Sequence, residues 1–281
     1  METLSIQHWL MQARHSLKNI DYPELEARLI LGKALEKDNP WLIAHSEVRL
    51  NYDQQASADQ LLRARLGGQP LPYTLGEWEF YGLSFYVNKH ALIPRPETEL
   101  LVETALAFLK KRDDVSMVAD VGTGSGCIAV SIAQNYANCL ITASDISFHA
   151  LKVTQKNCQR HTVDDRVMLM NMDLLSGLRT KFHLICANLP YIPSTTLEGL
   201  DVKKHEPVRA LDGGQDGLDF IRTILSESRD CLHPGGMLLV EIEYTQEAPV
   251  LRLAQAFFPE SGIQIKKDLS GHPRLLVINY R

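Results

Sequence analysis

The sequence predicts an α/β protein in which a small helical segment precedes a doubly wound, mostly parallel sheet. From Val115 onward, apolar strand-like runs alternate with helix-like segments, and this alternation is typical of a sheet with right-handed crossovers. The first 68 residues show only helical spacing of apolar residues. A chain of 281 residues with 45% hydrophobic and 22% charged residues suits one small and one medium globular domain.

Residues 1–75 are predicted to form a helical domain whose role is packing or partner recognition. Ser5 is placed to cap a first helix, and Pro23 opens a second, because proline fits the first turn of a helix. A third and a fourth helix are expected at residues 40–45 and 53–66. Nothing in this segment has the residue spacing of a catalytic site.

Residues 76–96 are predicted to be a β-hairpin linker. The stretch 69–73 is rich in proline and is expected to be a linker, whereas residues 77–87 alternate around a central glycine as a hairpin does. Residues 93–99, Ile-Pro-Arg-Pro-Glu-Thr-Glu, then lead into an amphipathic helix. Their acidic and hydroxyl groups either serve the start of that helix or place this turn at the functional edge of the sheet.

Residues 97–281 are predicted to form the sheet domain. Its strands are expected at residues 115–121, 140–145, 167–172, 182–187, 236–242, 262–268 and 274–280. Its helices are expected at residues 125–136, 147–160, 217–232 and 246–258. Because no helical pattern separates the last two strands, they are expected to form an antiparallel terminal hairpin.

Composition and charge argue against several classes of function. A net charge of −5 is unfavourable for a large nonspecific nucleic-acid footprint, so no stable nucleic-acid partner is expected. The five cysteines include no Cys-x-x-Cys pair and the ten histidines no His-x-x-x-His pair, so neither a disulfide framework nor a metal site is expected. No apolar stretch approaches a membrane span or the core of a signal peptide, which predicts a cytoplasmic protein.

A glycine-rich turn follows the first predicted strand of the sheet. The residues of interest are Asp120, Gly122, Thr123, Gly124, Ser125 and Gly126. Glycines at such a turn let a ligand approach the backbone, and the start of the next helix offers free N–H groups. A dinucleotide fingerprint would need a glycine at position 127, where this chain has Cys127. A phosphate-binding loop would need a lysine followed by Ser or Thr, which this turn lacks, so the turn matches neither motif.

Acidic residues follow the next two predicted strands. Asp145 lies about 20 residues beyond the glycines, where a carboxylate accepts hydrogen bonds from the ribose hydroxyls of a nucleoside cofactor. A helix N-cap explains Asp145 as well. Asp173, beside Leu174, ends the third strand and is open to the same two interpretations, a cofactor contact or a helix cap.

The fourth predicted strand ends in an unusual tetrad, Asn188-Leu189-Pro190-Tyr191. The tetrad offers a side-chain amide, backbone carbonyls, a proline that cannot donate a hydrogen bond, and an aromatic ring. That set suits a flat, neutral group bearing NH2; a proline-terminated strand with a capping asparagine is the alternative. Ligands of open α/β sheets bind outside the carboxyl ends of the strands, so the four strand ends are expected to meet.

Together these strand ends resemble those of class I S-adenosylmethionine-dependent methyltransferases, whose Rossmann-like domain has seven strands. The resemblance implies S-adenosylmethionine as the cofactor, with Asp120 reaching toward its methionine portion, Asp145 at the ribose and Asp173 near the adenine. The cofactor-binding residues that it implies are Asp120, Gly122, Thr123, Gly124, Ser125, Gly126, Asp145, Asp173, Leu174 and Asn188.

Tetrads of this type occur in methyltransferases that act on planar nitrogens of adenine, cytosine or a glutamine side chain. The oxygen of Asn188 and a carbonyl at Leu189 or Pro190 can hold both N–H groups of the acceptor and favour the charge that builds on its nitrogen. Tyr191 can pack over the planar group. The implied catalytic residues are Asn188, Pro190 and Tyr191, and the substrate-binding residues are the whole tetrad, Leu189 included.

The whole chain resembles the release-factor glutamine methyltransferases, the HemK/PrmC family. Besides the helical segment, the hairpin and the strand ends, the resemblance rests on residues 93–99, Glu206-Pro207, residues 210–218 and the closing stretch 267–274. It implies N5-methylation of the glutamine in the Gly-Gly-Gln motif of class I peptide chain release factors, which would be the protein partners.

Two residues depart from the family pattern. The family usually has proline at position 189 and glycine at position 243, where this chain has Leu189 and Glu243. Leucine relaxes the restriction that a proline imposes on Asn188, so the reaction is expected to be retained in a slightly looser site. Glu243 leaves the fine geometry of its strand end open.

Two other functions stay open. Asn-Leu-Pro-Tyr is also the form found in rRNA adenine dimethylases, so an rRNA adenine N6-methyltransferase is the alternative enzyme. Those enzymes tend to be basic and carry their helical domain after the catalytic one, unlike this chain. A non-catalytic nucleoside-binding protein is the third hypothesis, and the intact tetrad argues against it.

Overall fold

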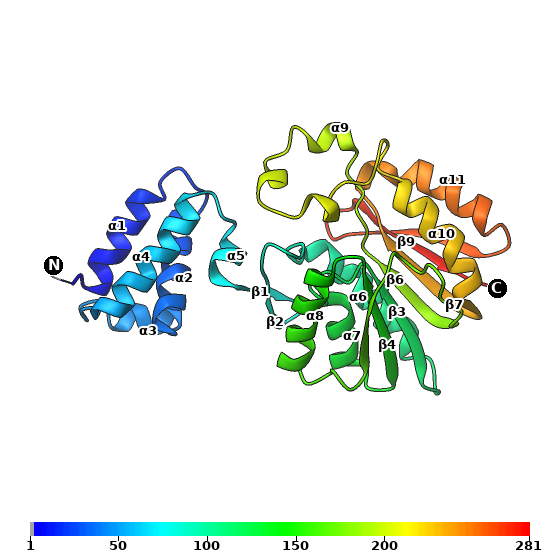
Figure 1. Cartoon of the computed structure of the whole chain (residues 1–281), viewed down its shortest axis with the longest axis horizontal. Coiled ribbons are helices and arrows are strands. Elements are labelled where there is room, and N and C mark those ends of the chain that lie inside the picture. Colours follow the sequence, from blue (N-terminus) through cyan, green and yellow to red (C-terminus); the bar gives the residue numbers. More distant parts are fainter. Residues whose placement is uncertain (1–2) are drawn as a thin grey trace. The chain divides into compact units, whose positions relative to one another are not determined.

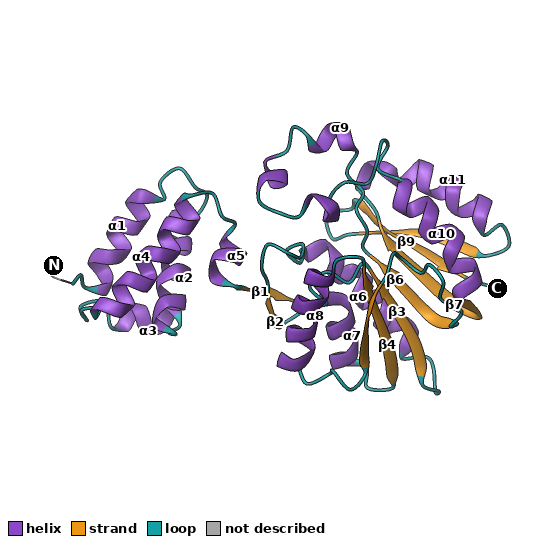
Figure 2. Cartoon of the chain, viewed as in Figure 1, coloured by secondary structure: helices purple, strands orange, loops and turns teal. Residues whose placement is uncertain are grey.

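The computed structural model describes residues 3–281, which divide into two compact units. One unit ends at Glu77 and the other begins at Trp78. Figure 1 follows the chain through both units, and Figure 2 shows that the first is helical whereas the second contains the sheet.

The first unit is a bundle of helices around an apolar core. Its helices are α1 (Ile6–Ser16), α2 (Pro23–Leu35), α3 (Asn39–Ala44), α4 (Tyr52–Leu66) and α5 (Leu71–Leu75). Trp9, Ile30 and Leu42 are almost completely buried in this core. The hydroxyl of Ser5 accepts a hydrogen bond from the His8 N–H and caps α1, so the capping prediction is confirmed.

The start of the expected linker is instead the short helix α5. Pro72 falls in its first turn, where a proline costs no hydrogen bond. Tyr73 and Leu75 are buried, and Gly76 ends the helix with a φ of 71°. The linker prediction was wrong for these residues because burial against the bundle, which local composition does not reveal, favours the helix.

The second unit begins with the predicted β-hairpin. Strand β1 (Glu77–Phe80) pairs with β2 (Leu83–Tyr86), and Tyr81 and Gly82 between them both have positive φ angles, as tight hairpin turns require. The side chain of Asn157 holds the hairpin in place. It accepts from the Tyr86 N–H (2.7 Å) and donates to the Tyr86 carbonyl (2.9 Å) and the Ser125 carbonyl (2.8 Å).

The large sheet has seven strands in the order β5-β4-β3-β6-β7-β9-β8. The strands are β3 (Ser116–Val121), β4 (Cys139–Asp145), β5 (Val167–Asn171), β6 (Phe182–Ala187), β7 (Leu232–Glu241), β8 (Gly262–Lys267) and β9 (Pro273–Asn279). Strands β3 to β7 run parallel, and β9 is antiparallel to both β7 and β8. The predicted fold class is therefore confirmed, including the antiparallel terminal hairpin.

Helices cover both faces of this sheet (Figure 2). They are α6 (Glu99–Leu109), α7 (Cys127–Asn135), α8 (Phe148–Arg160), α10 (Asp219–Cys231) and α11 (Glu247–Phe257). The connections contain the short helix α9 (Ser194–Leu197) and the 3-10 turns η1 (Pro96–Thr98), η2 (Asp201–Lys204), η3 (Val208–Ala210) and η4 (Tyr244–Gln246). One hydrophobic cluster joins α10 and α11 to the central strands through Leu225, Val250 and Ile185. Across residues 3–281, no helix combines the length and apolarity needed to cross a membrane.

Strand β6 lies between β3 and β7 in the middle of the sheet. All of its residues except His183 are buried, which explains its continuous apolar sequence. Because β3 to β7 are parallel, their carboxyl ends reach one edge of the sheet, and the residues after them face a common space.

Candidate active site

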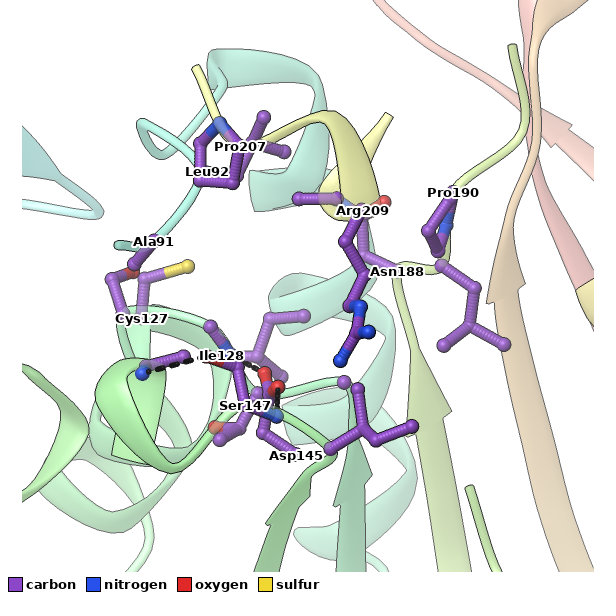
Figure 3. A pocket seen from close by; sticks show the side chains of 18 of the residues that line it. Ala91, Leu92, Cys127, Ile128, Asp145, Ser147, Asn188, Pro190, Pro207 and Arg209 are labelled. Atoms are coloured by element: carbon purple, nitrogen blue, oxygen red, sulfur yellow. Dashed lines mark hydrogen bonds between the residues drawn. The ribbon is translucent and has the colours of Figure 1, made fainter. Parts of the chain in front are cut away.

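A cavity of about 560 Å³ opens at the carboxyl ends of the parallel strands. The turns after β3, β4, β5 and β6 line it, and residues 90–95 and 207–210 complete its walls (Figure 3). The predicted site residues in its lining are Gly122, Thr123, Gly124, Ser125, Asp145, Asp173, Leu174, Asn188, Leu189 and Pro190. Three predicted residues are outside the lining: Asp120, Gly126 and Tyr191.

The turn after β3 has a backbone that only glycines adopt without strain. Gly122, Gly124 and Gly126 have φ angles of 71°, 57° and 81°. A Cβ at Gly126 would also lie 2.6 Å from Cγ2 of Thr154. The Thr154 hydroxyl also donates to the Gly124 carbonyl at 2.9 Å, so a side chain of α8 fixes the position of this loop.

Asp120 lies beneath the loop rather than in the cavity wall. It is fully buried, and its Oδ2 accepts from the Thr123 hydroxyl (2.6 Å) and the Ala129 N–H (3.2 Å). Its Oδ1 is buried and has no partner among the described residues. Burial raises the pKa of Asp120 to about 6.

Backbone N–H groups fix the carboxylate of Asp145, at the end of β4, at the cavity. Its Oδ2 accepts from the Gly124 N–H at 2.9 Å and its Oδ1 from the Ser147 N–H at 2.8 Å. Burial raises its pKa, whereas those two donors and Arg209 lower it. The N-cap of α8 is Ser147, whose hydroxyl accepts from the Ala150 N–H, so Asp145 is not the cap of that helix.

Asp173 and Leu174 line the cavity where the chain leaves β5. No helix begins at Asp173, because residues 174–177 form a turn, so the helix-cap interpretation was wrong. Asp173 is exposed, whereas Leu174 is buried with a φ of 46° and accepts from the Ser144 hydroxyl through its carbonyl.

Asn188 belongs to a small polar network that the sequence did not predict. Its Nδ2 donates to the Thr98 hydroxyl oxygen at 3.0 Å. The buried carboxylate of Glu241, at the end of β7, lies beside this pair, and both Thr98 and Asn188 lower its pKa. Burial, with a smaller contribution from Glu97, raises the pKa of Glu241 to about 7, while Thr98, Arg274 and Asn188 act in the opposite direction.

The other tetrad residues also have structural contacts. Leu189 is buried, and a Cβ at Gly122 would lie 2.9 Å from its Cδ2, so this leucine packs on the glycine loop. The Tyr191 carbonyl accepts from Nε2 of Gln246 at 3.1 Å. Burial raises the pKa of the Tyr191 phenol, which is therefore neutral at physiological pH.

Pro207, Arg209 and Ala210 line the cavity across from Asp145 (Figure 3). The buried carboxylate of Glu206 accepts from the Ile93 N–H (3.1 Å) and pairs with Arg95, which joins this segment to residues 93–95. Figure 3 shows the guanidinium of Arg209 extending into the cavity toward Asp145. No sequence pattern singles out Arg209, since it follows no predicted strand.

Strand β9 brings the positive charge of Arg274 to the same edge of the sheet. Asp268 accepts from Nε of Arg274 at 3.0 Å and from the His272 N–H at 2.9 Å, which orients the arginine. Arg274 lowers the pKa values of both Glu241 and Tyr191. The positive charge therefore acts at the ends of β6 and β7.

Glu243 needs no glycine at its position. Its φ is −74°, an ordinary value for any residue, and its carboxylate accepts from the Thr245 N–H at 2.7 Å. Gln246 completes a capping box with Glu243. The departure at this position is thus accommodated as a helix cap.

Comparison with known proteins identifies the family. The chain is 36% identical over 258 residues to the release factor glutamine methyltransferase of Clostridium botulinum, covering 90% of both chains. It is 40% identical over 258 residues to the release factor glutamine methyltransferase of Moorella thermoacetica, covering 91% of this chain and 90% of the relative. The chain belongs to the release factor glutamine methyltransferase family.

Both units share in this relationship. Residues 8–76 match the PrmC N-terminal domain, and residues 96–199 match the methyltransferase small domain. The fold also resembles the crystal structure of the ribosomal protein L11 methylase from Lactobacillus delbrueckii subsp. bulgaricus, with a TM-score of 0.52 and 18% identity over 69% of this chain and 84% of that one. The family expected from the motifs is therefore confirmed, and the chain is an enzyme of this family.

Proposed function

We propose that the protein transfers a methyl group from S-adenosylmethionine to the side-chain amide nitrogen of the glutamine in the Gly-Gly-Gln motif of class I peptide chain release factors. One observation carries the proposal. In a chain of this family, the same cavity is lined both by protein groups that suit a nucleoside cofactor and by Asn188 and Pro190. The helical unit, predicted as residues 1–75, would recognise the factor.

The residues present fit S-adenosylmethionine. A cavity of about 560 Å³ is of ordinary size for a small-molecule site. Each carboxylate oxygen of Asp145 keeps a lone pair beyond its backbone hydrogen bond and can accept from a ribose hydroxyl. Gly122 and Gly124 permit close approach to the backbone, and Asp173 and Leu174 would flank the adenine. Asp120, which is fully buried beneath the glycine loop, supports this loop by accepting from the Thr123 hydroxyl.

When bound, the cofactor supplies an electrophilic methyl group on its sulfonium. The protein's part is to position a poor nucleophile, because an amide lone pair is delocalised. Oδ1 of Asn188 and a carbonyl of Leu189 or Pro190 accept the two N–H groups of the glutamine, which aims its lone pair and favours the charge that develops on nitrogen. The neutral ring of Tyr191, which lies outside the cavity lining, would have to turn inward to pack over the planar amide. No strong base is required, since the methylated nitrogen sheds its proton readily.

The test is methyl transfer from labelled S-adenosylmethionine. We expect label on a class I release factor and none on the same factor with the motif's glutamine replaced by alanine. Ribosomal RNA is the matched alternative substrate, because Leu189 gives the tetrad the form found in rRNA adenine dimethylases. Label on the RNA with none on the factor would contradict the proposal.

A further inference from the structure

We infer that Glu241 and Thr98 are positioning residues that fix the amide orientation of Asn188, so that its Oδ1 and not its Nδ2 faces the methyl acceptor. The inference rests on the proposed function for its consequence in catalysis. The geometry itself involves only residues of this chain, so the orientation of Asn188 can be tested without a substrate.

The three side chains converge from separate segments. Ala187 at the end of β6 pairs with Val240 of β7, so Asn188 and Glu241 are neighbours just beyond that pair. Thr98 comes from η1, in the segment that precedes α6. Thr98 is 1% exposed and Glu241 4% exposed, so water does not compete for their hydrogen bonds.

The chemistry of the neighbouring groups favours one arrangement. An ionised carboxylate only accepts hydrogen bonds, so the Thr98 hydroxyl, which lies beside ionised Glu241, directs its single proton toward that carboxylate. The hydroxyl oxygen is then an acceptor, and it accepts from Nδ2 of Asn188 at 3.0 Å. Asn188 is also the register neighbour of Glu241, and of its amide only the NH2 can donate to an ionised carboxylate. Both neighbours therefore favour Nδ2 on their side, which leaves Oδ1 for the cavity.

The orientation matters because the acceptor is itself an NH2 group. A flipped Asn188 would present two donors to the donors of a glutamine amide and could not hold it. Burying a carboxylate is also costly, and Oε2 of Glu241 has no partner among the described residues. Packing alone does not account for a buried, incompletely paired carboxylate at a strand end, whereas a role in orienting Asn188 does.

Protonation of Glu241 should release the amide. A protonated carboxyl carries an O–H donor, which can donate to the oxygen of a flipped Asn188. The charged and titratable groups around Glu241 are Glu97 from η1, Arg274 from β9, Tyr191 after β6 and Cys127 from α7. Burial is the largest influence and places the pKa of Glu241 at about 7, so the switch falls within a measurable range.

The test compares Glu241→Gln, Thr98→Val and Thr98→Ser with Glu243→Gln as the matched control. Glu243 lies two residues beyond Glu241 but bonds to Thr245 instead. We expect Glu241→Gln and Thr98→Val to lower kcat about 10²-fold, the size seen when a reacting group is misplaced by ~1 Å, with the Kd for S-adenosylmethionine changed by less than about twofold. Thr98→Ser and Glu243→Gln should retain kcat. In the wild type, kcat should fall as the pH drops through about 7, and Glu241→Gln should lose that dependence.

A second readout needs no substrate. The side-chain NH2 resonances of Asn188, assigned by their absence in Asn188→Ala, are followed by NMR with 15N-labelled asparagine. They should titrate near pH 7 in the wild type and not in Glu241→Gln. Resonances that ignore both pH and the substitution, or unchanged kcat in Glu241→Gln, would overturn the inference. Failure of the wild type to methylate a release factor would instead overturn the proposed function, while the NMR titration still decides the orientation of Asn188.

Discussion

Replacing Asp145 by alanine is predicted to weaken S-adenosylmethionine binding about 100-fold. The carboxylate is already held by the Gly124 and Ser147 N–H groups at 2.9 and 2.8 Å, so it needs no reorganisation when a ribose arrives. A hydrogen bond to a charged group contributes about 1.5–3 kcal/mol. Because Asp145 is half-buried, the lower value applies to each of two ribose hydroxyls. The sum of about 3 kcal/mol corresponds to roughly 10²-fold in Kd.

Isothermal titration calorimetry of the protein with S-adenosylmethionine measures this loss directly. Asp164→Ala is the control, because Asp164 is an exposed aspartate outside the cavity lining. Turnover of Asp145→Ala at saturating cofactor should recover much of the wild-type kcat, since the acceptor site is intact. An unchanged Kd for Asp145→Ala would refute the ribose role.

Three further predictions concern other parts of the site. Asn188→Ala should lower kcat far more than cofactor affinity; equal losses in kinetics and calorimetry would make Asn188 a cofactor residue. Gly126→Ala should destabilise the protein by about 2 kcal/mol or more in urea unfolding, from its positive φ and its clash with Thr154, and Thr154→Ser should recover part of the loss. Glu241 has its pKa raised from 4.5 to about 7, so the native state binds the proton more tightly and its ionisation destabilises the fold as the pH rises. Between about pH 4 and about pH 8, Glu241→Gln should therefore gain about 3 kcal/mol of stability relative to wild type, and a pH-independent difference would contradict this.

The strand ends could be predicted from the sequence because each follows an apolar run. Asp145 and Asn188 stand out where such runs stop, and parallel strands bring their ends together by topology alone. Local alternatives were harder to exclude. Ser147, and not Asp145, caps α8. Which of two nearby polar side chains caps a helix depends on the backbone geometry at its start, and the pattern of residue types does not reveal that geometry.

The network around Asn188 could not be predicted because it depends on register. Glu241 also ends an apolar run, which is the same signal as at Asp145, but only the pairing of Ala187 with Val240 shows that it lies beside Asn188. Thr98 reaches the network from a segment 90 residues earlier. Leu189 is explained by its packing on Gly122, a contact between two turns that no single motif contains.

The central claim is tested most directly by mass spectrometry of a class I release factor before and after incubation with this protein and S-adenosylmethionine. The account predicts that the peptide containing Gly-Gly-Gln gains the mass of one methyl group, located by fragmentation on the glutamine side chain. A factor whose Gly-Gly-Gln peptide stays unmodified, while ribosomal RNA in the same reaction gains methyl groups on adenine, would contradict it.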